Sequence, residues 1–382
     1  MPATPAIWIL ALVPLAFAIA APLCGLVYRL SLCLGAIDTP GVAGQVKAPA
    51  RRVPNTGGVG VFWAIAIPLG LGLIALTVFG GTLGARLPES AAEHLPGARE
   101  RVPLGVVLLI SLAVLHAVGL LDDRRPLGPW IKLGVMLACG LGVALTQETR
   151  LLTVLDERVG GSWLSIGLTV LWFAVVTNAL NFLDNMDGLS AGVTAIAGGC
   201  FLATALLGGQ WFVAAVLALL VGACLGFLVW NFPRAKLFLG DGGSLVLGFL
   251  LAFLTVRTTY FTDQPGVLGI ASHPSVVLLP LVVLAVPIYD FVTVTAIRLS
   301  QGRSPFVGDL QHLSHRLVRR GLSRTNAVIV IWGFTGATGL AGIALGAADG
   351  WAATVIFAQV ALLLGVLAVF EYASSAGIEP AP

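Results

Sequence analysis

Long apolar blocks dominate this sequence and leave only short polar segments between them. Of its 382 residues, 58% are hydrophobic and 10% are charged, whereas soluble domains carry about 25% charged residues. A helix needs about 20 apolar residues to cross a bilayer, and the chain accommodates eleven such blocks. The pattern predicts an all-α, polytopic helical bundle in the lipid bilayer. It excludes a soluble fold and a disordered chain, and a membrane β-barrel would instead show short segments of alternating hydrophobicity.

The blocks are expected to form one integral membrane domain over residues 1–382, because the sequence contains no convincing repeat or linker. The predicted spans are 6–34, 57–81, 103–121, 130–146, 163–180, 191–207, 211–230, 243–261, 275–299, 327–346 and 351–370. No Lys or Arg precedes Arg29, so the first block is expected to be a retained span and not a signal peptide. All five cysteines fall in apolar blocks, which favours core positions over redox or metal roles.

Lys and Arg are shared unevenly between the two sides of this arrangement. Arg29 and the segments that follow odd-numbered spans are expected on one side of the membrane, and this side holds 15 of the 21 residues. The other side holds six. Positively charged loops stay in the cytosol, so we expect the N-terminus outside and the C-terminus in the cytosol of a multi-pass inner (plasma) membrane protein. The net charge of +3 is small and gives no reason to expect a nucleic-acid partner.

Carboxylates gather in the segments that this count assigns to the cytosol. Asp122 and Asp123 end the third span, where adjacent acids oppose the helix dipole. The pair could be a solvated edge stabilised by Arg124 and Arg125, or a base or metal ligand for phosphate chemistry. Lys132, nine residues after Asp123, could supply positive charge to the same site.

A second polar run leaves the fifth span, with Asn178, Asn181, Asp184 and Asp187 at every third residue. Neighbours at this spacing touch on a helix, but each step drifts by about 60°, so a tight 3₁₀ stretch or a helix that breaks into a loop is needed to bring all four together. A merely polar helix end is the alternative. Two amides and two acids with few balancing cations favour a ligand site.

Two further acids lie in unusual surroundings. Asp241 is flanked by Gly240 and Gly242 before the eighth span, where glycines allow a backbone and one carboxylate to approach a phosphate–metal unit. Glycines also simply begin helices and turns. Asp290 falls inside the ninth predicted span, where an acid needs a partner or a polar cavity, unless it lies near the cytosolic end and is hydrated.

The last large cytosolic segment carries Asp309, His312, His315 and Arg316, with further arginines behind them. The HxxH spacing hints at zinc, but a closed zinc site lacks a cysteine on this side. A cationic cluster that binds phosphate fits better. A basic segment against anionic lipid remains the alternative for the arginines.

Together these motifs resemble the polyprenyl-phosphate N-acetylhexosamine-1-phosphate transferase family. The resemblance covers about residues 45–325 and includes GLLDD, NALNFLDNMDGL, FLGDGGS, PIYD and DLQHLSHRL, in this order, with Pro54-Asn-Thr-Gly-Gly58 as an early signature. The number of spans and the short step from Asp123 to Lys132 look more like the N-acetylglucosamine branch than the phospho-MurNAc-pentapeptide translocase branch. One departure is Ser314, where the family usually has the first of two adjacent histidines.

The resemblance implies transfer of a sugar-1-phosphate from a UDP-N-acetylhexosamine to a polyprenyl phosphate, with release of UMP. It implies Mg²⁺ as the cofactor, with Mn²⁺ as an alternative ion, at an active site on the cytosolic face; a homodimer is compatible with it. The implied roles are catalysis by Asp122 and Asp123, metal binding by Asp241 and Asn181, and substrate binding by the remaining residues. These are Lys132, Asp184, Asp187, Phe238, Gly240, Asp309, His312, His315 and Arg316.

Other functions stay open at this point. Within the enzyme class, the donor could be UDP-MurNAc-pentapeptide. A transporter would also place acids within spans, but near the middle of the bilayer and not massed in cytosolic segments. A non-catalytic lipid-binding scaffold is compatible with Ser314, whereas the intact acids argue against it.

Overall fold

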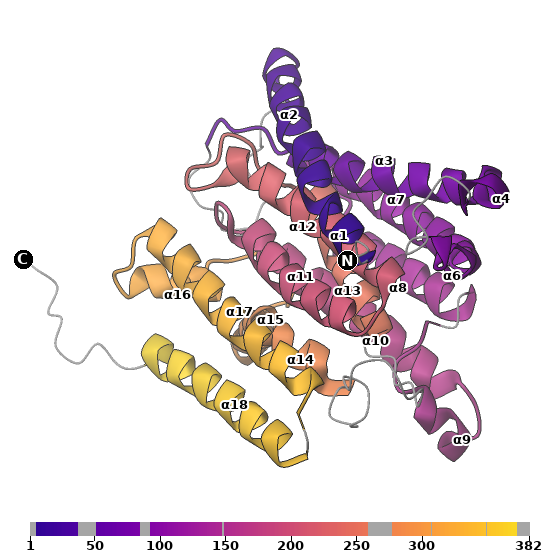
Figure 1. Ribbon diagram of the computed structural model, residues 1–382. Helices are drawn as coiled ribbons and strands as arrows, with labels where there is room; N and C mark the ends of the chain where they lie inside the picture. Colours follow the sequence, from indigo (N-terminus) through magenta and orange to yellow (C-terminus); the bar gives the residue numbers. More distant parts are fainter. Residues whose placement is uncertain are drawn as a thin grey trace, which may run out of the picture.

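A computed structural model of the chain shows a bundle of helices (Figure 1). It describes residues 5–36, 51–84, 92–146, 149–258, 277–306, 308–348 and 350–372. Within these ranges there is no β-strand, and ten helices or helix pairs are long and apolar enough to cross a membrane. The predicted all-α, polytopic class is therefore confirmed.

The helices of span length follow the predicted blocks closely. They are α1–α2 (Pro5–Leu10 and Leu12–Cys33), α3 (Gly57–Val78), α7 (Val102–Arg124), α8 (Pro129–Thr146), α10 (Trp163–Phe182), α11 (Leu189–Leu207), α12 (Trp211–Asn231), α13 (Asp241–Thr258), α17 (Arg324–Gly346) and α18 (Gly350–Tyr372). Shorter helices connect them: α4 (Gly80–Leu83), α6 (Leu95–Glu100), the 3₁₀ turn η2 (Thr153–Leu155), α9 (Asp156–Val159) and α16 (Leu313–Arg319).

The predicted ninth span, 275–299, is not one continuous helix. Its described part forms α14 (Leu279–Val283) and α15 (Ala285–Ser300), separated by Leu284. Pro287 has no N–H to donate to the carbonyl of Val283, and a proline ring clashes with the carbonyl four residues earlier. The apolar run predicted the segment correctly, but its proline breaks the helix.

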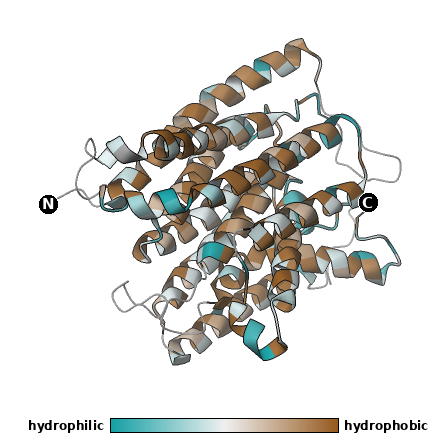
Figure 2. Ribbon diagram, turned by 90° about the vertical axis from the view of Figure 1, so that its right-hand side faces the viewer, coloured by the Kyte–Doolittle hydropathy of each residue, from teal (hydrophilic) through white to brown (hydrophobic). Residues whose placement is uncertain are grey.

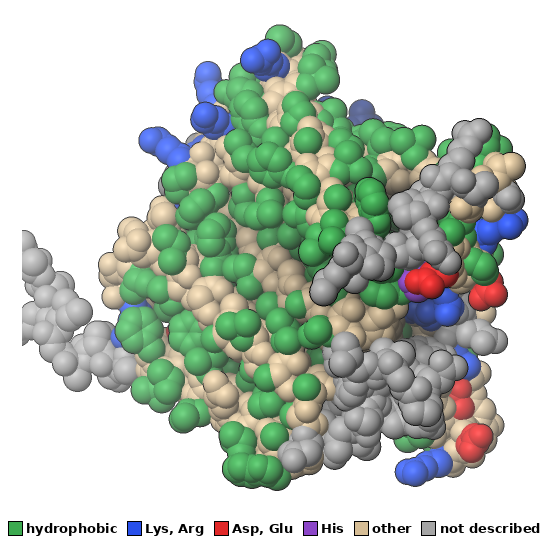
Figure 3. Space-filling model, in the orientation of Figure 1, with side chains coloured by type: hydrophobic (Ala, Val, Ile, Leu, Met, Phe, Trp, Pro, Cys, Tyr) green, Lys and Arg blue, Asp and Glu red, His purple; other side chains and the backbone are tan. Residues whose placement is uncertain are grey.

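Helix α13 lies at the centre of the bundle. All of its residues are buried except Asp241 at its start and Arg257 near its end, and it packs against α3, α7, α10 and α11. A helix that is apolar all round belongs in such a position. The outer helices carry the exposed apolar side chains, which cover most of the face in Figure 3, with charged side chains towards its edges.

One end of the bundle collects the ends of α7, α10 and α12, the start of α13, and α16. The last turn of α18 is at the same end, because Arg316 on α16 contacts Glu371 on α18 at 2.7 Å. In Figure 1 this end lies to the left and top, and α4, α6 and α9 lie at the opposite end. Figure 2 shows hydrophobic residues along the helices and hydrophilic ones mainly near their ends. The described parts of the segments predicted to share one side thus do so.

Candidate active site

The first helical turn of α13 is held by Asp123, at the end of α7. Its Oδ1 accepts the backbone N–H of Asp241 at 3.0 Å and its Oδ2 that of Gly242 at 3.1 Å. The first N–H groups of a helix have no partner within the helix, and a carboxylate there satisfies them and complements the helix dipole. Asp123, expected to be catalytic, therefore acts first as a cap that fixes α13 against α7.

Glycines allow this close approach. Gly240 has φ +71°, and a Cβ there would lie 2.6 Å from Asp123 Oδ2. Gly58 would place a Cβ 2.3 Å from the Gly243 nitrogen, and Gly119 would place one 2.5 Å from the backbone of Asp241. The start of α13 is thus packed against bare backbone of α3 and α7, which leaves its position little freedom.

Lys132 joins two of the predicted acids. Its Nζ donates to Asp122 Oδ2 at 2.9 Å and to Asp241 Oδ2 at 2.6 Å. Asn181 donates from Nδ2 to Asp241 Oδ1 at 3.0 Å. Side-chain exposures of 21% for Lys132, 14% for Asp122 and 24% for Asp241 leave these groups accessible to a ligand. We call Asp122, Asp123, Lys132, Asn181 and Asp241 the carboxylate–lysine cluster; the sequence predicted all five.

Negative charge exceeds positive charge around this cluster. Asp184, in the loop after α10, has a pKa raised well above the usual range by its burial and by the charges of Asp241 and Asp123. Among the described residues, the ammonium of Lys132 is the one that pairs with the cluster's carboxylates. Such a site attracts further positive charge. Within the described residues, however, no group of three or more His, Cys, Asp or Glu side chains is arranged to hold a metal ion.

Asp187 and Phe238 are brought together, as predicted, but with a partner that the sequence analysis did not identify. Both nitrogens of the Arg51 guanidinium fork donate to the Asp187 carboxylate, and the Ala235 N–H donates to it at 3.0 Å. The same guanidinium lies over the Phe238 ring, 5.0 Å from its centroid. In the sequence, Arg51 contributes only to the count of cytosolic Lys and Arg. Its position just before the PNTGG signature is the signal that could have identified it as a site residue.

The PNTGG segment is tied to the segment that carries Phe238. The Phe238 N–H donates to the Pro54 carbonyl, and the N–H groups of Gly57 and Gly58 donate to the carbonyls of Phe238 and Leu239, all at 2.8 Å. Two motifs about 180 residues apart in the sequence therefore form one rigid wall beside the start of α13.

A second group of charged side chains surrounds His312, at the start of α16. His312 Nδ1 lies 2.9 Å from Asp290 Oδ2, and its Nε2 lies 3.3 Å from Arg298 Nη2. Because a guanidinium only donates, Nε2 accepts and Nδ1–H donates to Asp290. Asp290 is 0% exposed, so the expectation of a partner is confirmed and the hydrated alternative is wrong.

Arg298 connects this group to Asp309 and to the carboxylate–lysine cluster. It donates to both Asp309 oxygens, at 3.0 and 3.2 Å, and these bonds outweigh burial and lower the pKa of Asp309. Its guanidinium lies 5.2 Å from the ring of Phe182, the residue after Asn181. Asp309 and His312 thus lie beside the end of α10, next to the cluster.

Arg316 makes its own set of contacts, with α15 and α18. It is 5% exposed and donates to Glu371 Oε2 on α18 at 2.7 Å and to Thr293 Oγ1 on α15 at 3.0 Å. Glu371 was missed by the sequence analysis, which ended the last span one residue earlier. The signal that could have identified it is its position, as an acid at the end of an otherwise uncharged span.

His315 and Ser314 occupy the remaining positions of the histidine motif. Burial and the positive charges of Arg324 and Arg319 lower the pKa of His315 to about 4, so its ring is neutral at physiological pH. Ser314 donates from Oγ to Asn185 Oδ1 at 2.5 Å. The serine thus ties α16 to the loop after α10.

Comparisons with known proteins find similar sequences among membrane transferases. Residues 105–259 match the family model described as glycosyl transferase family 4. A probable undecaprenyl-phosphate N-acetylglucosaminyl 1-phosphate transferase of Bacillus subtilis is 28% identical over 349 residues, which are 90% of this chain and 86% of that protein. A decaprenyl-phosphate N-acetylglucosaminephosphotransferase of Mycolicibacterium smegmatis is 34% identical over 69% of this chain and 66% of its own length. An undecaprenyl-phosphate alpha-N-acetylglucosaminyl 1-phosphate transferase of Escherichia coli is 27% identical over 60% and 62%.

Proposed function

Because this chain belongs to the polyprenyl-phosphate N-acetylglucosamine-1-phosphate transferase family, we propose that it transfers N-acetylglucosamine-1-phosphate from UDP-N-acetylglucosamine to a polyprenyl phosphate. An oxygen of the lipid phosphate attacks the β-phosphorus of the donor. The bond from that phosphorus to the bridging oxygen breaks, and UMP leaves with the bridging oxygen. The product is a polyprenyl-diphospho-N-acetylglucosamine, a starting unit for cell-wall or surface glycans.

The bridge that Lys132 makes between Asp122 and Asp241 is the observation that carries this proposal. It places one ammonium and two carboxylates at the end of the bundle where α7, α8 and α13 meet. An ammonium there can orient a phosphate, and a neighbouring carboxylate can accept a proton from it or hold a cation against it. A water-soluble nucleotide and a lipid phosphate could both reach this level of the molecule.

Mg²⁺ fits the residues present in the cluster. Magnesium prefers oxygen ligands and is commonly held by one or two carboxylates together with substrate phosphates and waters, so the lack of a third acid in a preformed group does not count against it. Asp241 and Asn181 would hold the ion, with Asp122 adjacent. When bound, the ion supplies neutralisation of the charge on the diphosphate.

The protein side chains divide the remaining tasks. Lys132 holds the phosphate of the acceptor against Asp122, and Asp123 fixes the first turn of α13, which carries Asp241. Arg51, Asp187 and Phe238 receive the uridine: Phe238 offers a ring for stacking and Asp187 an acceptor for the base. For this, Arg51 moves off the Phe238 ring and remains near the diphosphate.

The second group of charged residues contacts the sugar phosphate. His312 is oriented by Asp290 and Arg298, and Asp309 is held by Arg298. His315 lies on the same short helix. Because Arg316 is bound to Glu371, we assign it to holding α16 in place and not to a phosphate. The count of Lys and Arg supports placement of this end of the bundle in the cytosol, at the inner membrane.

Transfer by the purified protein tests the proposal. Radiolabelled UDP-N-acetylglucosamine and undecaprenyl phosphate with Mg²⁺ should yield a labelled lipid product and UMP, and excess EDTA should stop the reaction until Mg²⁺ or Mn²⁺ is restored. Lys132→Met should lower kcat/KM by about 100-fold or more, and Lys132→Arg, which keeps the charge, should lower it less. No labelled lipid from the wild type would refute the function, and labelling only from UDP-MurNAc-pentapeptide would replace the donor.

A further inference from the structure

His116 is a buried polar side chain within a membrane span, and the proposed reaction gives it no task. It lies on α7 and is 7% exposed. Its ring stacks on that of Phe62 on α3, with the centroids 4.3 Å apart and the planes 8° from parallel. Ionisable side chains inside a span are costly, and packing alone would be served by a leucine or a phenylalanine. A histidine at this position therefore calls for a polar partner.

The partner is the backbone carbonyl of Gly242, in the first turn of α13. His116 Nδ1 lies 2.7 Å from this oxygen, and because a carbonyl only accepts, Nδ1 carries the proton and donates it. Within a helix such a carbonyl accepts the N–H four residues later and has a second lone pair to offer. The imidazole is thus not needed to satisfy Gly242. What it adds is a link between α7 and α13.

One face of α7 holds Gly242 by both of its backbone groups. Asp123 accepts the Gly242 N–H at 3.1 Å, and His116 donates to the carbonyl. Gly119, between them on α7, would place a Cβ 2.5 Å from the Asp241 backbone. At 3.6 residues per turn, these three residues of α7 lie within about 60° of one another around the helix. One bond alone would let the start of α13 pivot, whereas the two bonds together fix its position and its rotation.

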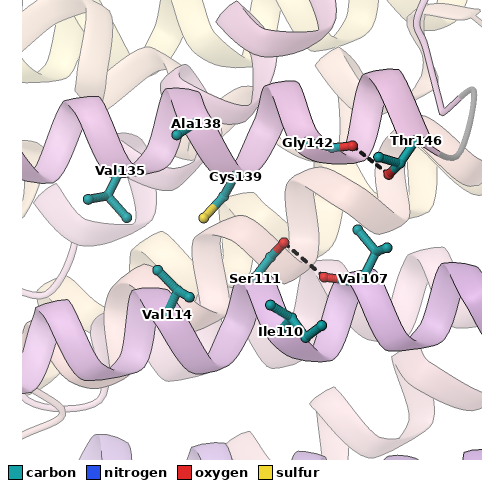
Figure 4. A pocket seen from close by; sticks show the side chains of 9 residues that line it. All are labelled: Val107, Ile110, Ser111, Val114, Val135, Ala138, Cys139, Gly142 and Thr146. Atoms are coloured by element: carbon teal, nitrogen blue, oxygen red, sulfur yellow. Dashed lines mark hydrogen bonds between the residues drawn. The ribbon is translucent and has the colours of Figure 1, made fainter.

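Another polar side chain of α7 provides a contrast. Ser111 lies about 140° around the helix from His116 and lines the pocket between α7 and α8 (Figure 4). Its hydroxyl donates to the Val107 carbonyl of its own helix at 2.9 Å. Such a bond satisfies the hydroxyl locally. The bond of His116 is of a different kind, because its acceptor lies on another helix, 126 residues away in the sequence.

We propose that His116 is a positioning residue for Asp241; this inference rests on the proposed function, in which Asp241 holds the divalent cation. Asp241 begins the turn that His116 fixes, and its carboxylate accepts from Lys132 Nζ at 2.6 Å and from Asn181 Nδ2 at 3.0 Å. The direction of a ligating carboxylate depends on its surroundings, which is why outer partners of metal ligands affect the affinity for the ion. By holding the Gly242 carbonyl, His116 keeps the Asp241 carboxylate aimed at the ion.

Two substitutions separate the hydrogen bond of His116 from its packing. His116→Phe keeps a ring against Phe62 but removes the donor, whereas His116→Asn keeps an N–H donor close to the place of Nδ1 but removes the ring. His116→Phe should therefore unfold at or above the wild-type temperature, and His116→Asn below it. Leu112→Ala is the matched control. Leu112 is 0% exposed on α7, one turn before His116, and its truncation weakens packing without removing a hydrogen bond.

Binding of Mn²⁺ to the purified protein in detergent, followed by electron paramagnetic resonance of the free ion, tests the inference without turnover. Removing an outer partner of a metal ligand costs about 10–100-fold in affinity, and His116 acts through the backbone, so the dissociation constant should rise by about tenfold in His116→Phe. His116→Asn should lie closer to the wild type, and Leu112→Ala should match it. The two histidine variants thus rank in one order for ion affinity and in the opposite order for stability.

Steady-state transfer gives a second readout. The Mg²⁺ concentration for half-maximal transfer should rise by about tenfold in His116→Phe, with kcat retained at saturating Mg²⁺. A loss of folded protein would instead lower kcat and leave that concentration unchanged.

Three results would overturn the inference even while wild-type transfer still supports the proposed function. They are wild-type Mn²⁺ affinity in His116→Phe, equal weakening of Mn²⁺ binding in all three variants, and a wild type that binds no Mn²⁺. If the wild type transfers nothing but the variants rank in Mn²⁺ affinity as expected, the proposed function fails and the role of His116 stands.

Discussion

Replacing Asp123 by Asn separates the capping role of this residue from a chemical one. The carboxylate accepts two backbone N–H groups at the start of α13, one on each oxygen. An amide has one acceptor oxygen, so one N–H loses its partner and faces an NH₂ group instead. An unsatisfied buried donor costs about 1–3 kcal/mol, and the lost charge at the helix terminus costs about 0.3–1 kcal/mol. Asp123→Asn should therefore destabilise the fold by about 1–4 kcal/mol.

The matched control is Asp122→Asn. Asp122 accepts the Leu127 N–H at 2.8 Å on one oxygen and Lys132 on the other, and an amide oxygen can keep the backbone bond. This variant should unfold close to the wild-type temperature but lose kcat, because Lys132 loses half of its anionic bridge.

Thermal unfolding in detergent, followed by tryptophan fluorescence, distinguishes the two variants. Unfolding entropy scales with chain length, so 1–4 kcal/mol in 382 residues corresponds to a fall in Tm of about 1–5 °C for Asp123→Asn. A wild-type Tm combined with abolished transfer in Asp123→Asn would refute the capping argument and return this residue to the chemistry.

Three further predictions follow from individual contacts. Glu371→Gln should lower the free energy of unfolding by about 1–3 kcal/mol, because buried Arg316 loses its charged partner, and it should also lower kcat; circular-dichroism melts and transfer rates measure the two effects. The pKa of His315 is about 4 in the folded protein and about 6.5 when unfolded, so the unfolded state binds a proton first and stability should fall from pH 7 towards pH 4; His315→Gln should flatten this loss in melts recorded over that range. Gly119→Ala should destabilise by about 1–3 kcal/mol and impair transfer, because the new Cβ would lie 2.5 Å from the Asp241 backbone; an unchanged melt would show that α7 can move away from α13.

The sequence was sufficient for the spans, apart from the break in the ninth one, and for the members of the carboxylate–lysine cluster. Spans follow from composition alone, since lipid imposes a length and an apolar surface. The cluster followed from side assignment: Asp122, Lys132, Asn181 and Asp241 all lie at span ends on the side richer in Lys and Arg. Residues at the same end of a bundle are candidates to meet, and these four do.

The pairings across the fold could not be predicted in this way. Arg51 meets Asp187 over 136 residues of sequence, and Arg316 meets Glu371 over 55. Local sequence spacing does not show which of the many arginines on the same side pairs with a given acid. For Glu371, the packing of α16 against α18 selects Arg316. The break at Leu284 is a different case, because Pro287 is a signal for it that is visible in the sequence. The prediction of one continuous helix followed the length of the apolar run instead.

The contact between Arg316 and Glu371 also has a consequence for how the protein is made. A ribosome synthesises Arg316 first, and Glu371 follows only after the two remaining spans, α17 and α18. Until α18 inserts, the guanidinium on α16 has no carboxylate to pair with, and burying it unpaired is costly. The segment that carries His312 and His315 should therefore settle last, so a nascent chain paused before α18 would already hold the carboxylate–lysine cluster but not a finished catalytic surface.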